Sequence, residues 1–125
     1  MRKFGLMAAL LLAGCSGIAM KPHAPGDDKA RAMLASGIKH YEDGDYREAI
    51  SDLQGSLDKG LAANADKVKA HKYLAFTYCI SSRETLCREE FSKALEVDPK
   101  FDLAPAEAGH PMWGSVFRSV KKNAK

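Results

Sequence analysis

Apolar residues recur every three or four positions along two stretches of the chain, the spacing that brings side chains to one face of an α-helix. The first stretch covers residues 33–57 and is broken by a tight Asp-Gly-Asp turn at residues 43–45. The second covers residues 68–97 and ends before Pro99. Each stretch predicts two antiparallel helices joined by a short turn, so the pattern predicts an all-α fold with two helical hairpins.

Small residues occupy matching positions in the two stretches. Gly37 in the first corresponds to Ala75 in the second, and Ala49 corresponds to Cys87. Small side chains on both helices of a hairpin let the two backbones approach closely, while larger apolar residues fill the space beside them. We therefore interpret the two stretches as an internal repeat.

A third apolar stripe lies near the C-terminus. Pro111 suits the first turn of a helix, because proline lacks the N–H that such a turn leaves unbonded. The stripe recurs at helical spacing and consists of Met112, Trp113, Val116, Phe117 and Val120. Two hairpins cannot bury their own outer faces. We therefore predict a C-terminal capping helix over residues 111–123 that packs on the second hairpin.

The N-terminus follows another pattern. Residues 1–3 are Met-Arg-Lys, and the apolar run from Phe4 to Leu12 is far shorter than the roughly 20 residues that span a bilayer as a helix. A positive start followed by a short apolar run is typical of a secretory signal. The run ends in Leu-Ala-Gly-Cys at residues 12–15. This ending resembles the lipobox of bacterial lipoproteins, and the alternative is an ordinary signal peptide with an incidental cysteine.

The lipobox resemblance implies that residues 1–14 are a cleaved signal peptide and that Cys15 becomes the mature N-terminus, carrying diacylglycerol and an N-linked acyl chain. Ser16 stands where an aspartate would retain an enteric lipoprotein in the inner membrane. The resemblance therefore implies a lipid-anchored protein of the cell envelope, in the outer membrane and facing the periplasm. We expect residues 15–28, which include prolines and glycines, to form a flexible linker, and residues 29–125 to form the domain.

Two segments of the expected domain resemble tetratricopeptide (TPR) repeats. Residues 44–50, GDYREAI, resemble the turn and second-helix start of that family, and residues 91–99, FSKALEVDP, resemble its repeat ending. The likeness covers residues 30–101. It departs from the family at Cys87, where alanine is usual, and at Leu61, where the closing proline of the first repeat would stand.

Carried onto this chain, the peptide-binding groove of the family falls on the first helix of each hairpin. The matching positions are Arg31, Leu34, Ile38, Tyr41, Lys69, Lys72, Phe76 and Ile80. Such a groove would have an apolar floor and a basic rim, and it would favour an extended or helical segment with apolar anchors and acidic flanks. The alternative is that Leu34, Ile38 and Phe76 are covered by the chain's own linker or last helix.

Charge and motif content argue against other classes of function. Removing Arg2 and Lys3 with the signal leaves 17 of the 19 basic side chains against 16 acidic ones, so no basic excess suggests a nucleic-acid partner. No phosphate loop, zinc-protease motif or nucleophile elbow occurs. His71 and Cys79 would lie about 12 Å apart along one helix, too far to share a zinc ion. We expect no enzyme, no catalytic residue, no metal and no cofactor other than the lipid on Cys15.

Cys79 and Cys87 flank a predicted turn between two helices. In an oxidising compartment such a pair can form a disulfide. Two buried thiols are the alternative, since cysteine replaces alanine at little cost in a close helix contact.

Residues 106–118, AEAGHPMWGSVFR, lie outside the TPR pattern and are similar to a lipoprotein group associated with type VI secretion. On this resemblance we expect an adaptor or assembly lipoprotein that binds protein partners of an envelope machine. A pilotin-like pilus assembly lipoprotein is one alternative. Another is a membrane-surface structural role through Arg118, Lys121, Lys122 and Lys125, whose charges could instead stabilise the end of the last helix.

Overall fold

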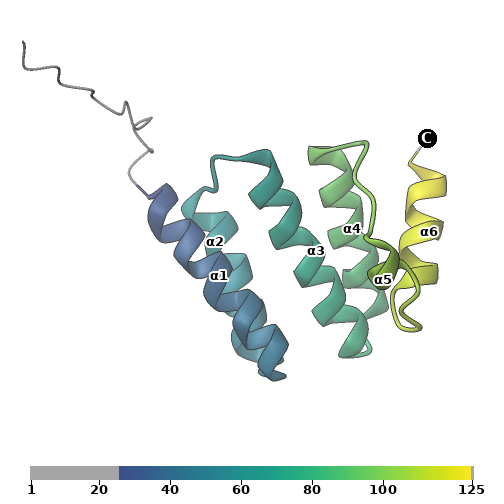
Figure 1. The fold of residues 1–125 in the computed structure, drawn as a ribbon, viewed down its shortest axis with the longest axis horizontal. Coiled ribbons are helices and arrows are strands. Elements are labelled where there is room, and N and C mark those ends of the chain that lie inside the picture. Colours follow the sequence, from purple (N-terminus) through teal and green to yellow (C-terminus); the bar gives the residue numbers. More distant parts are fainter. Residues whose placement is uncertain (1–25, 125) are drawn as a thin grey trace, which may run out of the picture.

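The structure, a computed structural model, describes residues 26–124 and shows that this part of the chain is all-α (Figure 1). Its six helices are α1 (Asp27–Asp43), α2 (Tyr46–Lys59), α3 (Asn64–Ile80), α4 (Glu84–Val97), α5 (Pro105–Ala108) and α6 (Gly114–Asn123). The all-α prediction is confirmed for these residues. The expected lipidation site Cys15, the signal peptide and most of the linker lie outside the described residues.

The helices form two packed pairs followed by α6. α1 packs along α2, α3 packs along α4, and contacts between α2 and α3 join the pairs. α6 lies against α4 at the far end of the stack (Figure 1). We call α1 and α2 the first helical pair, and α3 and α4 the second helical pair.

The first helix takes up the last residues assigned to the linker, because α1 begins at Asp27. The Asp27 side chain is buried, and its Oδ1 accepts a hydrogen bond from the Ala62 N–H at 2.9 Å. This bond ties the start of α1 to the connection between α2 and α3. The start of the first helix is therefore fixed by a contact distant in sequence.

Both helical pairs reverse direction through the same backbone conformation. Gly44 (φ 83°) follows α1, and Ser82 (φ 61°) occupies the equivalent place after α3. This left-handed region suits glycine and is uncommon for a residue with a side chain. In each turn the next N–H, of Asp45 or Arg83, donates to a carbonyl of the preceding helix at 2.8 Å.

The two pairs hold their helices together in different ways. In the first pair, Gly37 lies so close to α2 that a Cβ at this position would come within 2.7 Å of the Leu53 Cγ. In the second pair, a disulfide joins Cys79 to Cys87, whose Cα atoms are 5.3 Å apart and whose side chains are buried. The structure thus bonds the two cysteines that flank the turn.

The capping helix α6 covers the outer side of the second helical pair. The Phe117 ring meets the Phe91 ring of α4 with centroids 5.1 Å apart, and both side chains are buried. α6 begins at Gly114 and not at residue 111 as predicted, because Trp113 turns back toward α3 instead of continuing the helix.

Across residues 26–124 no helix combines the length and apolar character needed to cross a membrane.

Candidate protein-binding groove

The first helices of the two pairs, α1 and α3, lie side by side and border a hollow of about 390 Å³ near their N-terminal ends. Its apolar floor comes from Leu34 and Ile38 of α1, while Arg31 and Lys69 stand at its edge. Four of the predicted groove residues therefore meet in one place. We call this hollow the open half of the groove.

The edge of the open half carries both signs of charge and is not the basic rim predicted. Asp28 and Asp66 also line it, and the Asp66 carboxylate lies 3.8 Å from the Arg31 guanidinium. An ion pair this long and this exposed contributes little. Lys69 is exposed and makes no hydrogen bond or ion pair with another described residue. Sequence reasoning missed both carboxylates, although Asp66 precedes Lys69 by one helical turn.

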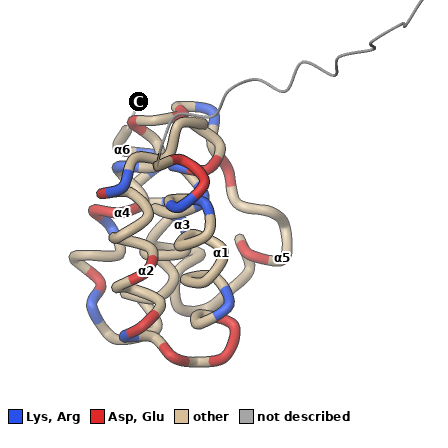
Figure 2. Tube along the Cα trace, turned by 90° about the vertical axis from the view of Figure 1, so that its left-hand side faces the viewer, with Lys and Arg blue, Asp and Glu red and all other residues tan. Residues whose placement is uncertain are grey.

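The other half of the predicted groove is covered by the chain itself. Residues 98–113, which we call the strap, connect α4 to α6. Figure 2 shows that the α5 segment of the strap stands out from the helical pairs on the side of α1 and α3. The strap ends at Trp113, whose indole ring stacks on the Phe76 ring with centroids 4.0 Å apart and planes 16° apart.

Phe76 is only 2% exposed beneath this indole. The prediction of an open groove at Phe76 is therefore wrong, and the alternative of a cover supplied by the chain holds for this residue. The physical reason is the large apolar area of an aromatic ring, which is stabilised more by another ring than by water.

Lys72 is engaged by the strap as well. Its ammonium donates a hydrogen bond to Glu107 Oε2 at 2.9 Å and lies 5.7 Å from the centroid of the Phe76 ring. Both partners of this ion pair are mostly buried, so water screens it less than the pair between Arg31 and Asp66. Lys72 therefore has no charge to offer an acidic partner while the strap is in place.

Tyr41 and Ile80, the remaining predicted groove residues, are half-buried. Tyr41 meets the Tyr73 ring with centroids 5.3 Å apart. Burial, followed by the charges of Tyr46, Tyr73 and Glu107, raises the pKa of Tyr41 to about 12. The phenol thus stays protonated at neutral pH and can donate a hydrogen bond. Ile80 packs against the core.

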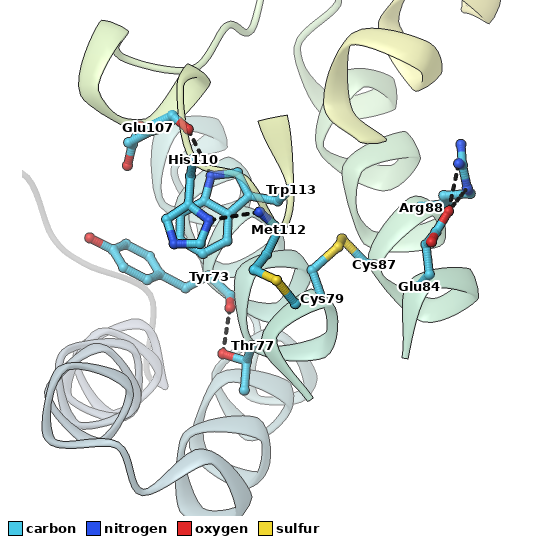
Figure 3. Close-up of a disulfide and its surroundings, with 10 residues drawn as sticks. All are labelled: Tyr73, Thr77, Cys79, Glu84, Cys87, Arg88, Glu107, His110, Met112 and Trp113. Atoms are coloured by element: carbon cyan, nitrogen blue, oxygen red, sulfur yellow. Dashed lines mark hydrogen bonds and ion pairs between the residues drawn. A yellow bond between two sulfur atoms is a disulfide. The ribbon is translucent and has the colours of Figure 1, made fainter. Parts of the chain in front are cut away.

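Polar and ring contacts hold the strap in place (Figure 3). The Trp113 Nε1–H donates to the Glu107 carbonyl at 2.8 Å, and the His110 ring stacks on the indole with centroids 3.5 Å apart. The Met112 N–H donates to His110 Nδ1 at 3.1 Å. Within the strap only Leu103 and Trp113 are buried, so the strap is anchored in the core at two points and residues 104–112 between them stay at least partly exposed.

A separate buried pair lies within the second helical pair. His71 Nδ1 of α3 and Glu90 Oε2 of α4 are 2.6 Å apart, and the Lys93 ammonium donates to Glu90 Oε1 at 2.9 Å. Burial alone would raise the pKa of Glu90, but hydrogen bonds from His71 and Lys93 outweigh it and lower that pKa below its ordinary value. None of the three residues lines the open half, so we interpret them as a link between α3 and α4.

The described part of the chain contains no cluster of side chains that could form a metal site. Across residues 26–124 no three His, Cys, Asp or Glu side chains gather where they could hold a metal ion. The expectation that the protein needs no metal stays a prediction.

The C-terminal cations are partly engaged inside the molecule. Arg118 donates to a carbonyl of α5 at 3.1 Å, and the Lys121 ammonium lies 3.1 Å from the Asp102 carboxylate. Lys122 is exposed without an internal bond, and Lys125 lies outside the described residues. A membrane-surface role would therefore depend on fewer free charges than the sequence offers.

Comparisons of the chain with protein-family models, with curated proteins and with solved structures found no match. The resemblance to TPR lipoproteins stays a prediction.

Proposed function

We propose that this chain is a lipid-anchored periplasmic adaptor that binds a segment of a protein partner in the open half of the groove. The observation that carries the proposal is the hollow between α1 and α3, with an apolar floor and charges of both signs at its edge. Concave sites with apolar floors and a few polar groups are the usual form of binding sites. An amphipathic helix or an extended segment fits this one, because its apolar side chains can enter between the helices while its charges meet Lys69 and Asp66.

The anchor and the compartment in this proposal rest mainly on the sequence. Lipid on Cys15 would hold the domain at the outer membrane, facing the periplasm. The disulfide between Cys79 and Cys87 supports an oxidising compartment. A Cys15→Ala chain should remain an unprocessed precursor that does not partition with membranes, and unchanged partitioning would refute the anchor.

The TPR resemblance supports the choice of an adaptor over an enzyme. Two TPR-type repeats would have equivalent turns and matching small residues. The equivalent turns lie at Gly44 and Ser82, and the matching small residues are Gly37 and Ala75. The segment similar to a type VI secretion lipoprotein group covers residues 106–118. It forms the second half of the strap and the first residues of α6. We therefore propose that the partner belongs to that envelope machine.

Site-specific photo-crosslinking in cells tests the groove. Ala35 is exposed and lines the open half, whereas Ser51 is exposed on α2 and lies outside it. A photoreactive residue in place of Ala35 should capture a discrete envelope protein, and the same residue in place of Ser51 should not. Equal products from both positions, or none from Ala35, would contradict the proposal.

A further inference from the structure

A second hollow, of about 300 Å³, lies at the opposite end of the helical pairs from the open half. It is lined by Tyr46, Arg47 and Ile50 of α2 and by Ser81 and Arg83 of the turn between α3 and α4. The open half lies near the N-termini of α1 and α3, so the two hollows share no residue. Any ligand bound here would leave the groove accessible.

Two arginines border this hollow without an internal counter-charge. Of the arginines in the described part of the chain, Arg31 and Arg88 form ion pairs, and Arg118 donates to a carbonyl. The side chains of Arg47 and Arg83 are exposed and make no hydrogen bond or ion pair with another described residue. The only two unbonded arginines of residues 26–124 therefore meet at one hollow.

Nearby carboxylates do not compensate for these two charges. None lines the hollow. Asp45 is exposed and makes no hydrogen bond or ion pair with either arginine, lying 3.6 Å from the His40 ring without a hydrogen bond to it, and Glu84 is bonded to Arg88 at 2.7 Å. Glu48 is exposed beside the first arginine in sequence, but adjacent residues of a helix do not face each other. The hollow thus keeps an excess of positive charge.

The chemistry of the lining defines the ligand. A guanidinium group binds a carboxylate through two parallel N–H···O bonds, and two cations at one site repel each other until an anion lies between them. The hydroxyls of Tyr46 and Ser81 can add hydrogen bonds. Ile50 is half-buried at the same hollow and offers apolar contact that an alkyl group can use and a small inorganic ion cannot.

We propose that this hollow binds a carboxylate of an acidic protein segment, with an apolar neighbour of that carboxylate resting on Ile50. The site is independent of the groove between α1 and α3, so either can be disproved without the other. A partner that engages both sites would contact the two ends of the helical pairs at once.

The test uses the full chain in detergent and a fluorescent, end-blocked peptide of alternating glutamate and leucine, titrated at low salt. Arg47→Gln combined with Arg83→Gln should raise the Kd of this peptide at least about tenfold, because charge-assisted hydrogen bonds are lost. Lys100→Gln combined with Lys122→Gln removes the same charge from exposed positions outside the hollow. This control should leave the Kd within about twofold.

The remaining outcomes decide between specific and general attraction. Equal weakening in the lysine control overturns the proposal, as does equal binding of a peptide with glutamine in place of glutamate. If inorganic phosphate at matched ionic strength displaces the probe as well as unlabelled peptide does, the hollow is a simple anion site and the proposal fails. If the glutamine variant does not fold, Arg47→Lys combined with Arg83→Lys replaces it. This variant keeps both charges but loses the paired N–H geometry of the guanidinium groups, so it should still weaken binding of the peptide. An unchanged Kd for the lysine variant overturns the proposal.

Discussion

The open and covered halves of the groove begin from equivalent residues and end differently. Ile38 and Phe76 each follow the small residue that aligns the two stretches, Gly37 and Ala75. Ile38 is half-buried and borders the hollow, whereas Phe76 is buried beneath Trp113. The terminal element of a stacked helical array needs a cover for its outer face, which α6 supplies here, while the strap covers Phe76 on the groove side. The strap, more than the groove residues, therefore decides which half is open at the surface.

Removing the cover is the strongest test of this comparison. Trp113→Ala should lower the free energy of unfolding by about 3–5 kcal/mol, because it leaves a void above Phe76 and removes the bond to the Glu107 carbonyl. Urea denaturation followed by circular dichroism measures the change. Met112→Ala is the matched control, since Met112 is 47% exposed, and it should change the value by less than about 0.5 kcal/mol. Similar small effects for both variants would mean that the strap is not a structural cover.

The disulfide is the next largest difference, because the first helical pair contains no cysteine. Cys79→Ala combined with Cys87→Ala should reduce the free energy of unfolding by about 2.5 kcal/mol in the chain-entropy view of a short closed loop. Mass spectrometry of the unreduced chain should find both residues in one linked fragment with two hydrogens missing. Alkylation of both thiols in unreduced, natively purified protein would refute the bond.

Lowering the pH should destabilise the second helical pair, because it protonates Glu90. Although burial opposes it, hydrogen bonding by His71 and Lys93 holds the pKa of Glu90 below its ordinary value of 4.5. A carboxyl whose pKa is lowered by folding contributes stability above its unfolded-state pKa and loses it as the pH falls through its folded-state pKa. The free energy of unfolding should therefore decline as the pH is lowered from 4.5.

Glu90→Gln should remove this part of the acid dependence and cost about 1–2 kcal/mol at neutral pH, because a charge-assisted bond is lost inside the protein. Denaturation curves measured between neutral and acidic pH give both quantities. Glu96→Gln, at an exposed position on the same helix, is the control and should retain the decline. A decline of equal size in all three proteins would assign it to other carboxyls.

The period of apolar residues predicts the four long helices because each carries buried residues over several turns, although residues 74–79 of α3 are buried on all sides. The same signal cannot predict α5, which has four residues and none buried. Trp113 fits the apolar stripe of the last helix in sequence, yet its ring packs on α3. Periodicity reports that a residue is buried, and it does not report which element buries it.

The groove shows the same limit. An apolar residue on the inner face of a helix gives the same sequence pattern whether a partner or the chain itself covers it, so the sequence does not distinguish Phe76 from Ile38. The charges at the edge of the open half are even harder to predict from the sequence. Asp28 and Asp66 come from different helices, and only the fold brings them to one hollow. Helical spacing predicts neighbours on one helix and says little about neighbours across two.

Lys69→Glu has the smallest expected effect on the fold and bears most directly on function. Lys69 is exposed without an internal bond, whereas Lys72, one turn further along α3, is bonded to Glu107. Reversing Lys69 should change the free energy of unfolding by less than about 0.5 kcal/mol. It should nevertheless reduce capture of the partner from Ala35 if that partner carries acidic residues, and the reduction should be larger at low salt, where screening is weaker.

Lys72→Glu is the matched charge reversal for Lys69→Glu. It places a second carboxylate against Glu107, so it should lower the free energy of unfolding and release the strap, which hydrogen exchange of residues 104–112 would detect as faster exchange. The two lysines thus separate binding from folding: one reversal should act on capture alone, the other on the fold first. If Lys69→Glu leaves capture unchanged at every salt concentration, acidic residues of the partner do not use the open half, and the outer face of the strap around the exposed Met112 becomes the surface to test.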